Sequence, residues 1–434
     1  MRINRSQQLK NKLDAVIKAM DMNKDDYVMR PGIDFSRNRK IPFETTIKMI
    51  LGMGANSLRK EIYDMFPDFS ERMTPSAFVQ QRSKIKPEAF EYAFNKFNAF
   101  TDLSDNKTHN GYHLFAIDGT ALNIAKNPLS NTYFEQGFNQ FHLCSLYDIC
   151  NKTFKGCVIQ PRPKMNENAA CKEMVKRSTF PEKSIIIGDR LFANYAIYET
   201  INRIPNLDYL IRARNHYSTE TKKLPMMELD VDRTVELRTT QSKKDVEDFK
   251  SGRAKWIAGP SKSGKEKKYV SWEFESPCKI TMRIVRFELS SSEYETIVTS
   301  LSRSEFPLQE IKKLYAMRWG IETAFREIKY AMGMTNFHAI KEDFIIQEIY
   351  AKLLMYNFSM RIAMHVGLTK TDRKYDYQIN FTHAMYVCVH FFRGRDGPLI
   401  EAEIASCILP IRPGRSDNRK IIPKGHIPFT YRVA

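Results

Sequence analysis

The order of strand-like and helical segments constrains the fold of this chain more than any other feature. Three apolar runs follow one another from about residue 112 to 160, YHLFAID, QFHLCSLYDI and TFKGCVIQ, and all three have strand character. A helical stretch at 167–177, the run SIIIGD, a helix at 193–203 and the run DYLIRAR come next. Three meandering strands followed by strand-helix-strand alternation predict a mixed α/β sheet whose later strands are parallel.

The segment before this block is predicted to be helical. Residues that begin helices stand at Asn56 and Ser57, at Thr74 with Pro75, and at Pro87, whose helix should end near Phe100. The segment Ile41–Phe66 has Gly52 and Gly54 between two amphipathic halves, a pattern shared by a helix-turn-helix and by any helix pair with a short link.

The helical signal disappears again between about residues 214 and 302. Four strand-like runs stand there, TVELRTT, YVSWEFES, KITMRIVRFEL and YETIVTSL, which indicate an all-β insertion. Helical segments at 307–334 and 343–366 follow, and then an apolar segment near 383–392 and a basic tail. We therefore expect a helical N-terminal domain (1–105), an α/β core (106–213 and 303–366), a β-rich insertion (214–302) and a C-terminal region (367–434).

Charge indicates the kind of partner. The chain carries 68 Lys and Arg against 50 Asp and Glu, a formal net charge of +18, so a partner rich in negative charge is expected. The most apolar stretch, Leu353–Val366, is interrupted by Arg361, and the N-terminus has no secretory signal. We expect a cytoplasmic protein without a membrane partner, whose seven scattered cysteines are buried thiols.

Two carboxylates follow apolar strands. Asp118 comes after YHLFAI and Asp189 after SIIIG, so both are expected at the carboxyl edge of the sheet, where open α/β sheets form their sites. Taken singly, an aspartate that ends a strand is more often a turn residue or a helix cap.

A third group lies on the helical segment KKLYAMRWGIETAFREIKY. Tyr315, Arg318, Glu322 and Lys329 fall within a sector of about 60° at about 100° per residue, whereas Glu327 lies about 140° away from Glu322. On an isolated helix this stripe would be a solvated face with one weak ion pair.

The three acidic residues together indicate a definite chemistry. Carboxylates on separate elements can hold a pair of divalent cations for phosphodiester chemistry, and they suit Mg²⁺ or Mn²⁺. Arg318 and Lys329 would then hold phosphates near the reacting bond.

These residues resemble the DDE transposases of bacterial insertion sequences, in the branch with a Tyr-x2-Arg-x3-Glu-x6-Lys signature. Tyr315, Arg318, Glu322 and Lys329 complete that signature, and DGT (118–120) and GDRLFANY (188–195) resemble the two Asp motifs. The resemblance runs from about residue 40 to the C-terminus and is loose in the insertion and the tail.

The resemblance implies an RNase H-like catalytic core that is interrupted by the insertion. Asp118, Asp189 and Glu322 would bind two Mg²⁺ ions, with Mn²⁺ able to substitute, and Tyr315, Arg318, Lys329 and Arg190 would contact DNA. The implied function is a nucleoid-associated transposase that cleaves the inverted repeats at the ends of its element. It would join the 3′-hydroxyl ends to target DNA, as a homodimer that pairs two ends. The alternatives are a non-catalytic, domesticated DNA-binding protein and a nuclease of the same fold without strand transfer.

Other motifs fit less well. GPSKSGKE (259–266) nearly matches a phosphate-binding loop, but Glu266 stands where a hydroxyl is needed and a strand-like run follows. The basic loop 250–268 and the tail 412–434 could contact DNA or be merely solvated. None of Trp256, Trp272 and Trp319 can be matched to the aromatic residue with which some relatives hold a flipped base. His338 is expected to be structural.

Overall fold

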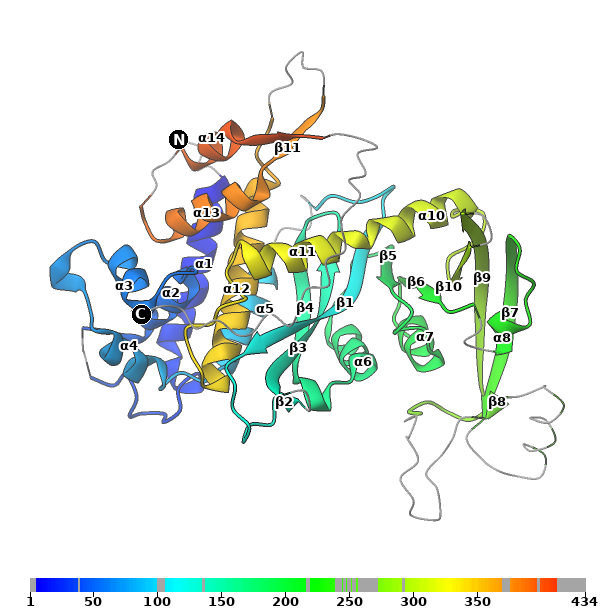
Figure 1. Cartoon of the computed structure of the whole chain (residues 1–434), viewed down its shortest axis with the longest axis horizontal. Helices are drawn as coiled ribbons and strands as arrows, with labels where there is room; N and C mark the ends of the chain where they lie inside the picture. Colours follow the sequence, from blue (N-terminus) through cyan, green and yellow to red (C-terminus); the bar gives the residue numbers. More distant parts are fainter. Residues whose placement is uncertain are drawn as a thin grey trace.

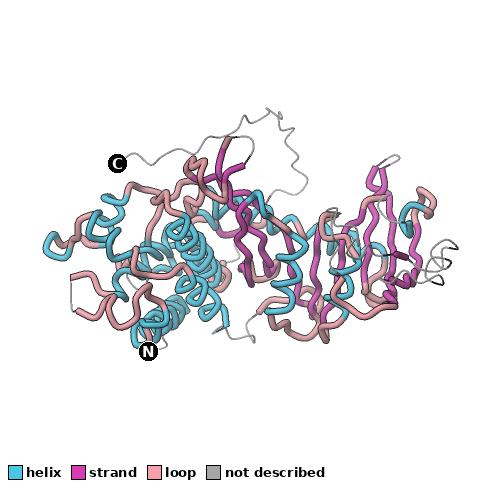
Figure 2. The backbone as a smooth tube through the Cα atoms, turned by 90° about the horizontal axis from the view of Figure 1, so that it is seen from below, coloured by secondary structure: helices cyan, strands magenta, loops and turns pink. Residues whose placement is uncertain are grey.

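The computed structural model describes residues 5–37, 40–99, 106–134, 137–215, 219–238, 244, 247, 251, 255–256, 272–290, 293–368, 375–395 and 399–411. A helical body fills one half of the molecule and a long sheet extends through the other half (Figures 1 and 2).

The first part of the sheet has the order β4-β3-β1-β5-β6. An antiparallel meander forms first, from β1 (His113–Ile124), β3 (Phe138–Asp148) and β4 (Thr153–Pro161), with the short β2 (Tyr133–Phe134) on β3. Then β5 (Ser184–Gly188) pairs parallel to β1, and β6 (Leu207–Ala213) pairs parallel to β5. The predicted mixed sheet is confirmed, and its strand order is that of an RNase H-like core.

Helices cover both faces of this sheet. Side chains of β1 alternate between the faces, since Phe115 and Ile117 pack with α6 (Glu167–Arg177) and α7 (Tyr195–Asn202). The residues between them face the other way, and Ala116 packs in the cluster that includes α11 (Trp319–Tyr330) and α12 (Glu342–Ala363). Leu114 packs beside α10 (Leu308–Met317). Asp118 therefore projects from β1 toward the α11 face.

The β-rich insertion does not form a sheet of its own. β10 (Glu293–Thr299) pairs antiparallel with β6, β9 (Cys278–Ser290) pairs with β10, and β7 (Leu229–Arg238) pairs with β9. The short elements here are β8 (Lys255–Trp256) and α8 (Thr219–Lys222). The insertion thus lengthens the core sheet to ten strands. The run YVSWEFES was predicted as a strand, which is wrong for its described residues 272–276, because they form bends and loop before β9.

The helical body surrounds α12, which is buried along almost its whole length. The helices that share its core are α1 (Arg5–Met22), α2 (Phe43–Gly52), α3 (Leu58–Met65), α4 (Pro75–Arg82), α5 (Glu88–Ala99), α13 (Phe381–Phe392) and α14 (Ile400–Ser406). Single turns of 3-10 helix stand at Lys24–Asp26, Phe69–Glu71 and Arg162–Lys164, and β11 (Tyr377–Ile379) pairs with β12 (Ile408–Pro410). Segments from both ends of the chain therefore pack in one core.

The predicted helix starts are confirmed. Thr74 occupies the N-cap of α4, where its hydroxyl accepts a hydrogen bond from Ala77 N at 3.2 Å, and Pro75 is the first helical residue. Ser57 is the N-cap of α3, without a side-chain hydrogen bond. The pair α2 and α3 is the helix pair expected in Ile41–Phe66.

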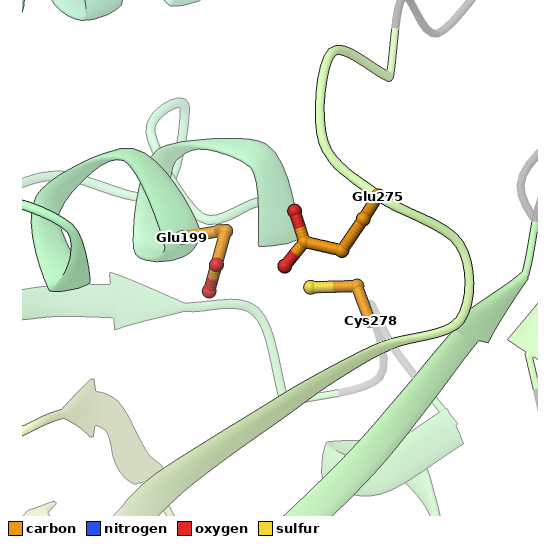
Figure 3. A group of neighbouring side chains, drawn as sticks. All are labelled: Glu199, Glu275 and Cys278. Atoms are coloured by element: carbon orange, nitrogen blue, oxygen red, sulfur yellow. The ribbon is translucent and has the colours of Figure 1, made fainter.

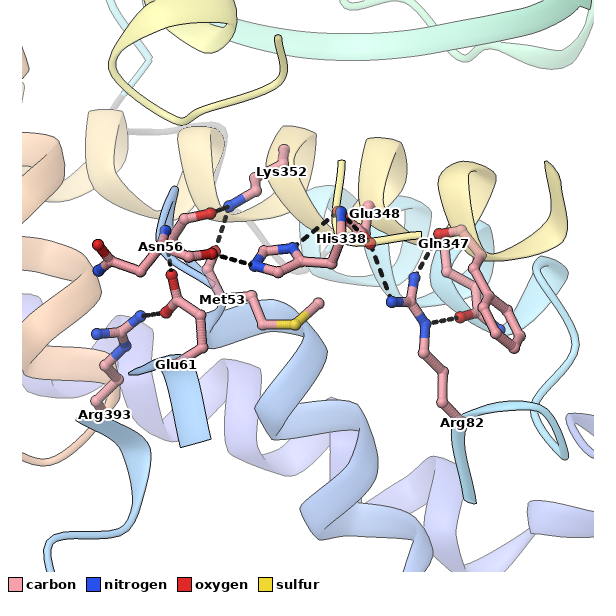
Figure 4. A network of polar contacts seen from close by, with 11 residues as sticks. Met53, Asn56, Glu61, Arg82, His338, Gln347, Glu348, Lys352 and Arg393 are labelled. Atoms are coloured by element: carbon pink, nitrogen blue, oxygen red, sulfur yellow. Dashed lines mark hydrogen bonds and ion pairs between the residues drawn. The ribbon is translucent and has the colours of Figure 1, made fainter. Parts of the chain in front are cut away.

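A buried polar network fastens the turn between α2 and α3 to α12 (Figure 4). Lys352 Nζ donates to Gly54 O at 3.0 Å, and Arg393 Nη2 donates to Gly52 O at 2.7 Å. Arg393 also forms an ion pair with the buried Glu61. Buried backbone carbonyls need hydrogen-bond donors, and side chains distant in sequence supply them here.

The same network continues along α12 to α4. Arg82 forms an ion pair with Glu348 at 2.9 Å and donates through Nε to Gln347 Oε1 at 2.8 Å. Burial alone would raise the pKa of Glu348, but Arg82 and His338 hold that pKa far below its usual value. The charge of Arg82, which is 2% exposed, is thereby balanced inside the helical body.

All seven cysteines are free thiols, and five of them are buried. No helix in the described part of the chain combines the length and apolarity that a membrane crossing requires.

Candidate active site

The two aspartates follow register partners on adjacent parallel strands. Ile117 of β1 pairs with Gly188 of β5, and this is the last pair between the two strands. Asp118 and Asp189 are the residues that follow this pair in the chain. The expectation that Asp118 ends its strand is wrong, because β1 continues to Ile124 through its pairing with β3. Asp118 is the first residue of β1 beyond its pairing with β5. It lies at an edge of the sheet because β5 ends there, although β1 itself continues.

Both oxygens of Asp118 are engaged. Gly119 N–H donates to Oδ1 at 2.8 Å, and Arg318 Nη1 lies 3.3 Å from Oδ2. Burial raises the pKa of Asp118 to about 6, and the negative charges of Asp189 and Glu322 act in the same direction. The Gly119 amide and the Arg318 guanidinium oppose that rise only in part. The raised pKa of Asp118 is therefore chiefly an effect of burial, and the two neighbouring carboxylates add to it.

Asp189 takes part in a turn. Its Oδ1 accepts a hydrogen bond from Leu191 N at 2.9 Å, in the segment that leads to α7. Asn194 then caps α7, since its side chain accepts from Ile197 N at 3.0 Å. Asp189 is thus a turn residue, one of the roles expected for an aspartate after a strand. Its carboxylate nevertheless lies near enough to Asp118 to help raise the pKa of Asp118.

The signature segment was expected as one helix, and the structure divides it in two. α10 ends at Met317 and α11 begins at Trp319, while Arg318 between them keeps helical dihedrals (φ −51°, ψ −34°). The two helices follow one another in nearly one line (Figure 1). Because the helical path persists through Arg318, the expected pairing with Glu322 forms, with Nη2 2.8 Å from Oε1.

Arg318 links the helix to the sheet. Its guanidinium contacts Glu322 on its own helical path and Asp118 on β1, and its side chain is 8% exposed. A planar guanidinium can serve two carboxylates at once, because its donors point in different directions. The structure thus brings Asp118, Arg318 and Glu322 into one contact group, with Asp189 close enough to raise the pKa of Asp118.

Lys329 and Tyr315 lie at the two ends of this group. Lys329 Nζ donates to Thr120 Oγ1 at 2.6 Å, and Thr120 is two residues beyond Asp118 on the same face of β1. Burial lowers the pKa of Lys329, and among the described residues no carboxylate forms an ion pair with it. Tyr315 is buried, and within the described part of the chain its hydroxyl has no hydrogen-bond partner. Glu327, excluded by its angle, instead accepts a hydrogen bond from Tyr356 at 2.8 Å.

The chemistry of the donor set fits a divalent cation. Arg318 contacts two of the three carboxylates, Asp118 and Glu322, and one guanidinium can neutralise only one of their charges. Oxygen donors with excess negative charge are what Mg²⁺ and Mn²⁺ prefer. Asp118, Asp189 and Glu322 are therefore suitable ligands.

A tighter group of possible ligands lies elsewhere. Glu199, Glu275 and Cys278 are the one set in the described residues whose three ligand atoms all lie within 4.8 Å of one another (Figure 3). Arg203 already contacts both carboxylates, with Nε 2.7 Å from Glu199 Oε1 and Nη2 2.5 Å from Glu275 Oε1. That arginine offsets one of their two negative charges and already engages both carboxylates.

A basic pocket next to Asp189 was not foreseen. Its volume is about 530 Å³, and its polar lining comes from Arg190, Arg212, Arg214, Asn215, Tyr294 and Glu295. Arg212 Nε lies 2.8 Å from Glu295 Oε1, which leaves the pocket with an excess of arginines. The one sign of this pocket in the sequence is the pair Arg212 and Arg214, at the end of the DYLIRAR run. The sequence could not show that β10 of the insertion would bring Tyr294 and Glu295 beside them.

The remaining expectations have mixed outcomes. His338 is structural, since its Nδ1 lies 3.1 Å from Glu348 Oε2 and its Nε2 3.0 Å from Asn56 O. Trp319 is 60% exposed at the start of α11, and Trp272 donates to Glu275 O at 3.3 Å. The side chain of Trp256, the near-match at 259–266, most of the basic loop 250–268 and the tail 412–434 lie outside the described residues.

One family model matches more than half of the chain. The model of the family described as "Transposase DDE domain" matches residues 109–358, a span that holds β1 to β10, α10, α11 and most of α12. The transposase InsG for insertion sequence element IS4 of Escherichia coli (strain K12) is 22% identical over 350 residues, which are 74% of this chain and 70% of that protein. A piggyBac transposase, solved in a synaptic complex with hairpin DNA, is 11% identical with a TM-score of 0.45, over 96% of this chain and 86% of that one.

Proposed function

Because the chain belongs to the DDE transposase family, we propose that it excises its insertion sequence by cutting DNA at the element's ends and joins the 3′-hydroxyl ends to target DNA. Membership makes it a DNA transposase. The cut-and-paste course, strand transfer and the residues responsible are the parts we propose here.

One observation carries the proposal. Asp118 and Asp189 follow the last register pair of two parallel strands, and Arg318 joins Asp118 to Glu322 from a different part of the chain. Three carboxylates separated by up to about 200 positions thus share one end of the sheet, next to a buried cation and an arginine-lined pocket. A site that must bind metal ions and a polyanion at the same point needs this combination.

In this proposal Asp118, Asp189 and Glu322 hold two Mg²⁺ ions, for which Mn²⁺ can substitute. Two such ions, when bound, help to activate a water or a 3′-hydroxyl and stabilise the leaving oxygen. The protein's task is to place the three carboxylates, to keep Asp118 deprotonated and to align the phosphodiester. Arg318 serves the first task by holding Asp118 and Glu322 at fixed positions.

The cationic side chains align the substrate. Lys329 presents a half-buried ammonium whose hydrogen-bond partner is a neutral hydroxyl, so a phosphate oxygen can become its counter-ion. Tyr315 offers a buried hydroxyl on the same helical face. Arg190 lies directly after Asp189 and lines the basic pocket, where the backbone of the same DNA strand can continue. We propose that one DNA backbone runs from the three carboxylates to the arginines of the neighbouring pocket.

We further propose the partners and the division of the chain. Double-stranded DNA, as inverted repeats and as target, is the substrate, and a homodimer holds two ends in the synaptic complex. The N-terminal helices (1–105) recognise the ends, while 106–213 and 303–366 cut and join, and the protein acts at the nucleoid. The insertion (214–302) and the C-terminal region (367–434) add DNA contacts.

The test is cleavage of a labelled DNA bearing the element's end, with Mg²⁺, by Asp118→Asn, Asp189→Asn and Glu322→Gln. Each variant should bind the end as the wild type does and cut it at least about 1000-fold more slowly, the scale of losing a group that acts at the reacting phosphate. Glu327→Gln is the matched control, an acid of the same helix that faces away from the site, and it should cut normally. Near-normal cleavage by any of the three variants would refute the assignment.

The same assay separates the alternatives. A non-catalytic DNA-binding protein would bind the ends and never cut them. A nuclease without strand transfer would cut the ends, but pre-cut ends bearing a free 3′-hydroxyl would not join to a supercoiled plasmid. Joined products from pre-cut ends, lost in Asp118→Asn, are the result expected for a transposase.

A further inference from the structure

A histidine and a glutamate on the far face of β1 lie directly behind Asp118. His142 on β3 is the register partner of Ala121, and its ring projects to the face that also carries Gly119. Its Nε2 lies 2.8 Å from Oε1 of Glu167, the first residue of α6. His142 is 3% exposed and Glu167 14% exposed at the side chain, so the pair is shielded from water.

The partners of His142 fix its proton. Arg162 Nη1 lies 3.3 Å from Nδ1 of the ring, and a guanidinium can only donate. Nδ1 must therefore accept, which leaves the proton of the neutral ring on Nε2, on the side of Glu167. The geometry around Nε2 does not allow a hydrogen bond to Glu167. The contact between the two side chains is therefore chiefly electrostatic.

The pair fills the space where a side chain at position 119 would stand. A Cβ added to Gly119 would lie 2.3 Å from Glu167 Oε1 and 2.4 Å from His142 Nε2, well inside van der Waals contact. A larger residue at this position would force the His142 ring and the Glu167 carboxylate to shift, whereas the backbone dihedrals do not demand glycine. The ring and the carboxylate thus lie close to the backbone of β1 at Gly119, the residue after Asp118.

That backbone also holds the carboxylate. Gly119 N–H donates to Asp118 Oδ1 at 2.8 Å, while Arg318 contacts Oδ2 from the opposite face. A displacement of β1 at Gly119 would move both the donor and the Cα to which the carboxylate is attached. Groups that orient a metal ligand without touching the metal commonly change metal affinity by about 10- to 100-fold when they are removed.

We propose that His142 and Glu167 are positioning residues, which through Gly119 set the place of Asp118 in the active site. This inference rests on the proposed function, because it presumes that Asp118 is a metal ligand. It assigns the pair no contact with DNA or with a metal ion. The pair instead determines how well a ligand on the other face of the sheet is placed.

The experiment measures Mn²⁺ binding to the DNA-free protein, by the electron paramagnetic resonance signal of free Mn²⁺, alongside cleavage of the end. Gly119→Ala should weaken Mn²⁺ binding about tenfold and slow cleavage, because the new methyl group and the pair cannot occupy the same space. The triple variant Gly119→Ala/His142→Ala/Glu167→Ala removes the obstacle, and its Mn²⁺ affinity should lie within about threefold of that of the double variant His142→Ala/Glu167→Ala. A methyl group at position 119 that weakens binding only while the pair is present is a result that a general loss of stability cannot produce.

Variants that keep Gly119 guard against a failure to fold. Glu167→Ala leaves the ring without its electrostatic partner and should weaken Mn²⁺ binding, whereas Glu167→Gln, of equal size, should retain more of it. Thermal unfolding and end binding without metal, both unchanged, show that the protein is intact. The proposal is overturned if Gly119→Ala or His142→Ala/Glu167→Ala binds Mn²⁺ like the wild type, or if Gly119→Ala weakens binding as much in the absence of the pair as in its presence.

Failure of this inference is distinguishable from failure of the proposed function. If Asp118→Asn cuts normally, the function fails and the inference with it. If Asp118→Asn is inactive while Glu167→Ala binds Mn²⁺ and cuts as the wild type does, only the positioning role is refuted.

Discussion

Ile117 of β1 and Gly188 of β5 are the last register partners between these two parallel strands, and an aspartate follows each of them. Beyond this point β1 continues beside β3 alone, while the chain after Gly188 turns away toward α7. Asp118 is therefore partly buried beside a strand and Asp189 is held in a turn. The two carboxylates differ in environment although their sequence contexts look alike, and predictions follow from that difference.

The pKa of Asp118 predicts how Mg²⁺ binding depends on pH. Burial and the neighbouring carboxylates raise this pKa to about 6, so a proton competes with the metal below that pH. The Mg²⁺ concentration for half-maximal cleavage should rise about tenfold for each pH unit below about 6, and it should vary little between pH 7 and 8. Cleavage rates over a Mg²⁺ series at several pH values measure this, and a flat dependence from pH 5 to 7 would contradict it.

The same pKa predicts a stability effect in the metal-free protein. Because the folded-state pKa lies above the unfolded value of 3.8, the folded state holds this proton more tightly, so Asp118 destabilises the fold progressively as the pH rises through this range. Asp118→Asn removes the penalty and should raise the free energy of unfolding by about 1–3 kcal/mol above pH 6, with no gain near pH 4. Chemical denaturation in the presence of a chelator tests both signs.

Added Mg²⁺ should reverse that order. The wild type gains stability from binding the ion and Asp118→Asn gains less, since ligands that bind only the folded state stabilise it by mass action. A variant that stayed more stable than the wild type in saturating Mg²⁺ would argue against Asp118 as a ligand.

Lys329 should contribute one ionic contact to DNA. Its ammonium is half-buried beside Thr120 and forms no ion pair with a carboxylate of the described residues, so a phosphate would be its counter-ion. Lys329→Met should weaken end binding and make the slope of log affinity against log salt shallower by about 1. Lys313→Met is the control, since Lys313 is 70% exposed on the same helical segment and lies beside Glu310. Equal salt slopes for the wild type and Lys329→Met would exclude the contact.

The buried network around α12 should dominate the stability of the helical body. Glu348→Gln removes a charge that balances the buried Arg82, and an uncompensated buried charge costs about 3–5 kcal/mol. Urea unfolding should show a loss of that order. Glu173→Gln breaks an exposed pair with Arg177, in which Glu173 is 55% exposed, and should cost less than about 0.5 kcal/mol. Similar losses in both variants would show that Arg82 finds another partner.

Local sequence patterns predicted most elements of the fold because short-range physics determines them. The helix at 167–177 begins at Glu167 and ends at Arg177 as predicted, since Asn166 caps it and its apolar face is regular. The strand runs before Asp118 and Asp189 were correct for the same reason. The described residues 272–276 of the run containing Trp272 are not a strand. Alternating apolar residues indicate only that a segment could be a strand, and none of the described strands pairs with these residues.

The sequence by itself determined the order of strands and helices, the three carboxylates and the signature spacing, because capping, periodicity and chain order are local properties. Only the tertiary structure decided that β10 would join β6 and so bring Tyr294 and Glu295 beside Arg212. The tertiary structure alone also decided that Arg318 contacts Asp118 as well as Glu322, and that His142 and Glu167 occupy the space next to Gly119. These contacts join residues far apart in the chain, and their geometry depends on how a whole sheet packs between two layers of helices.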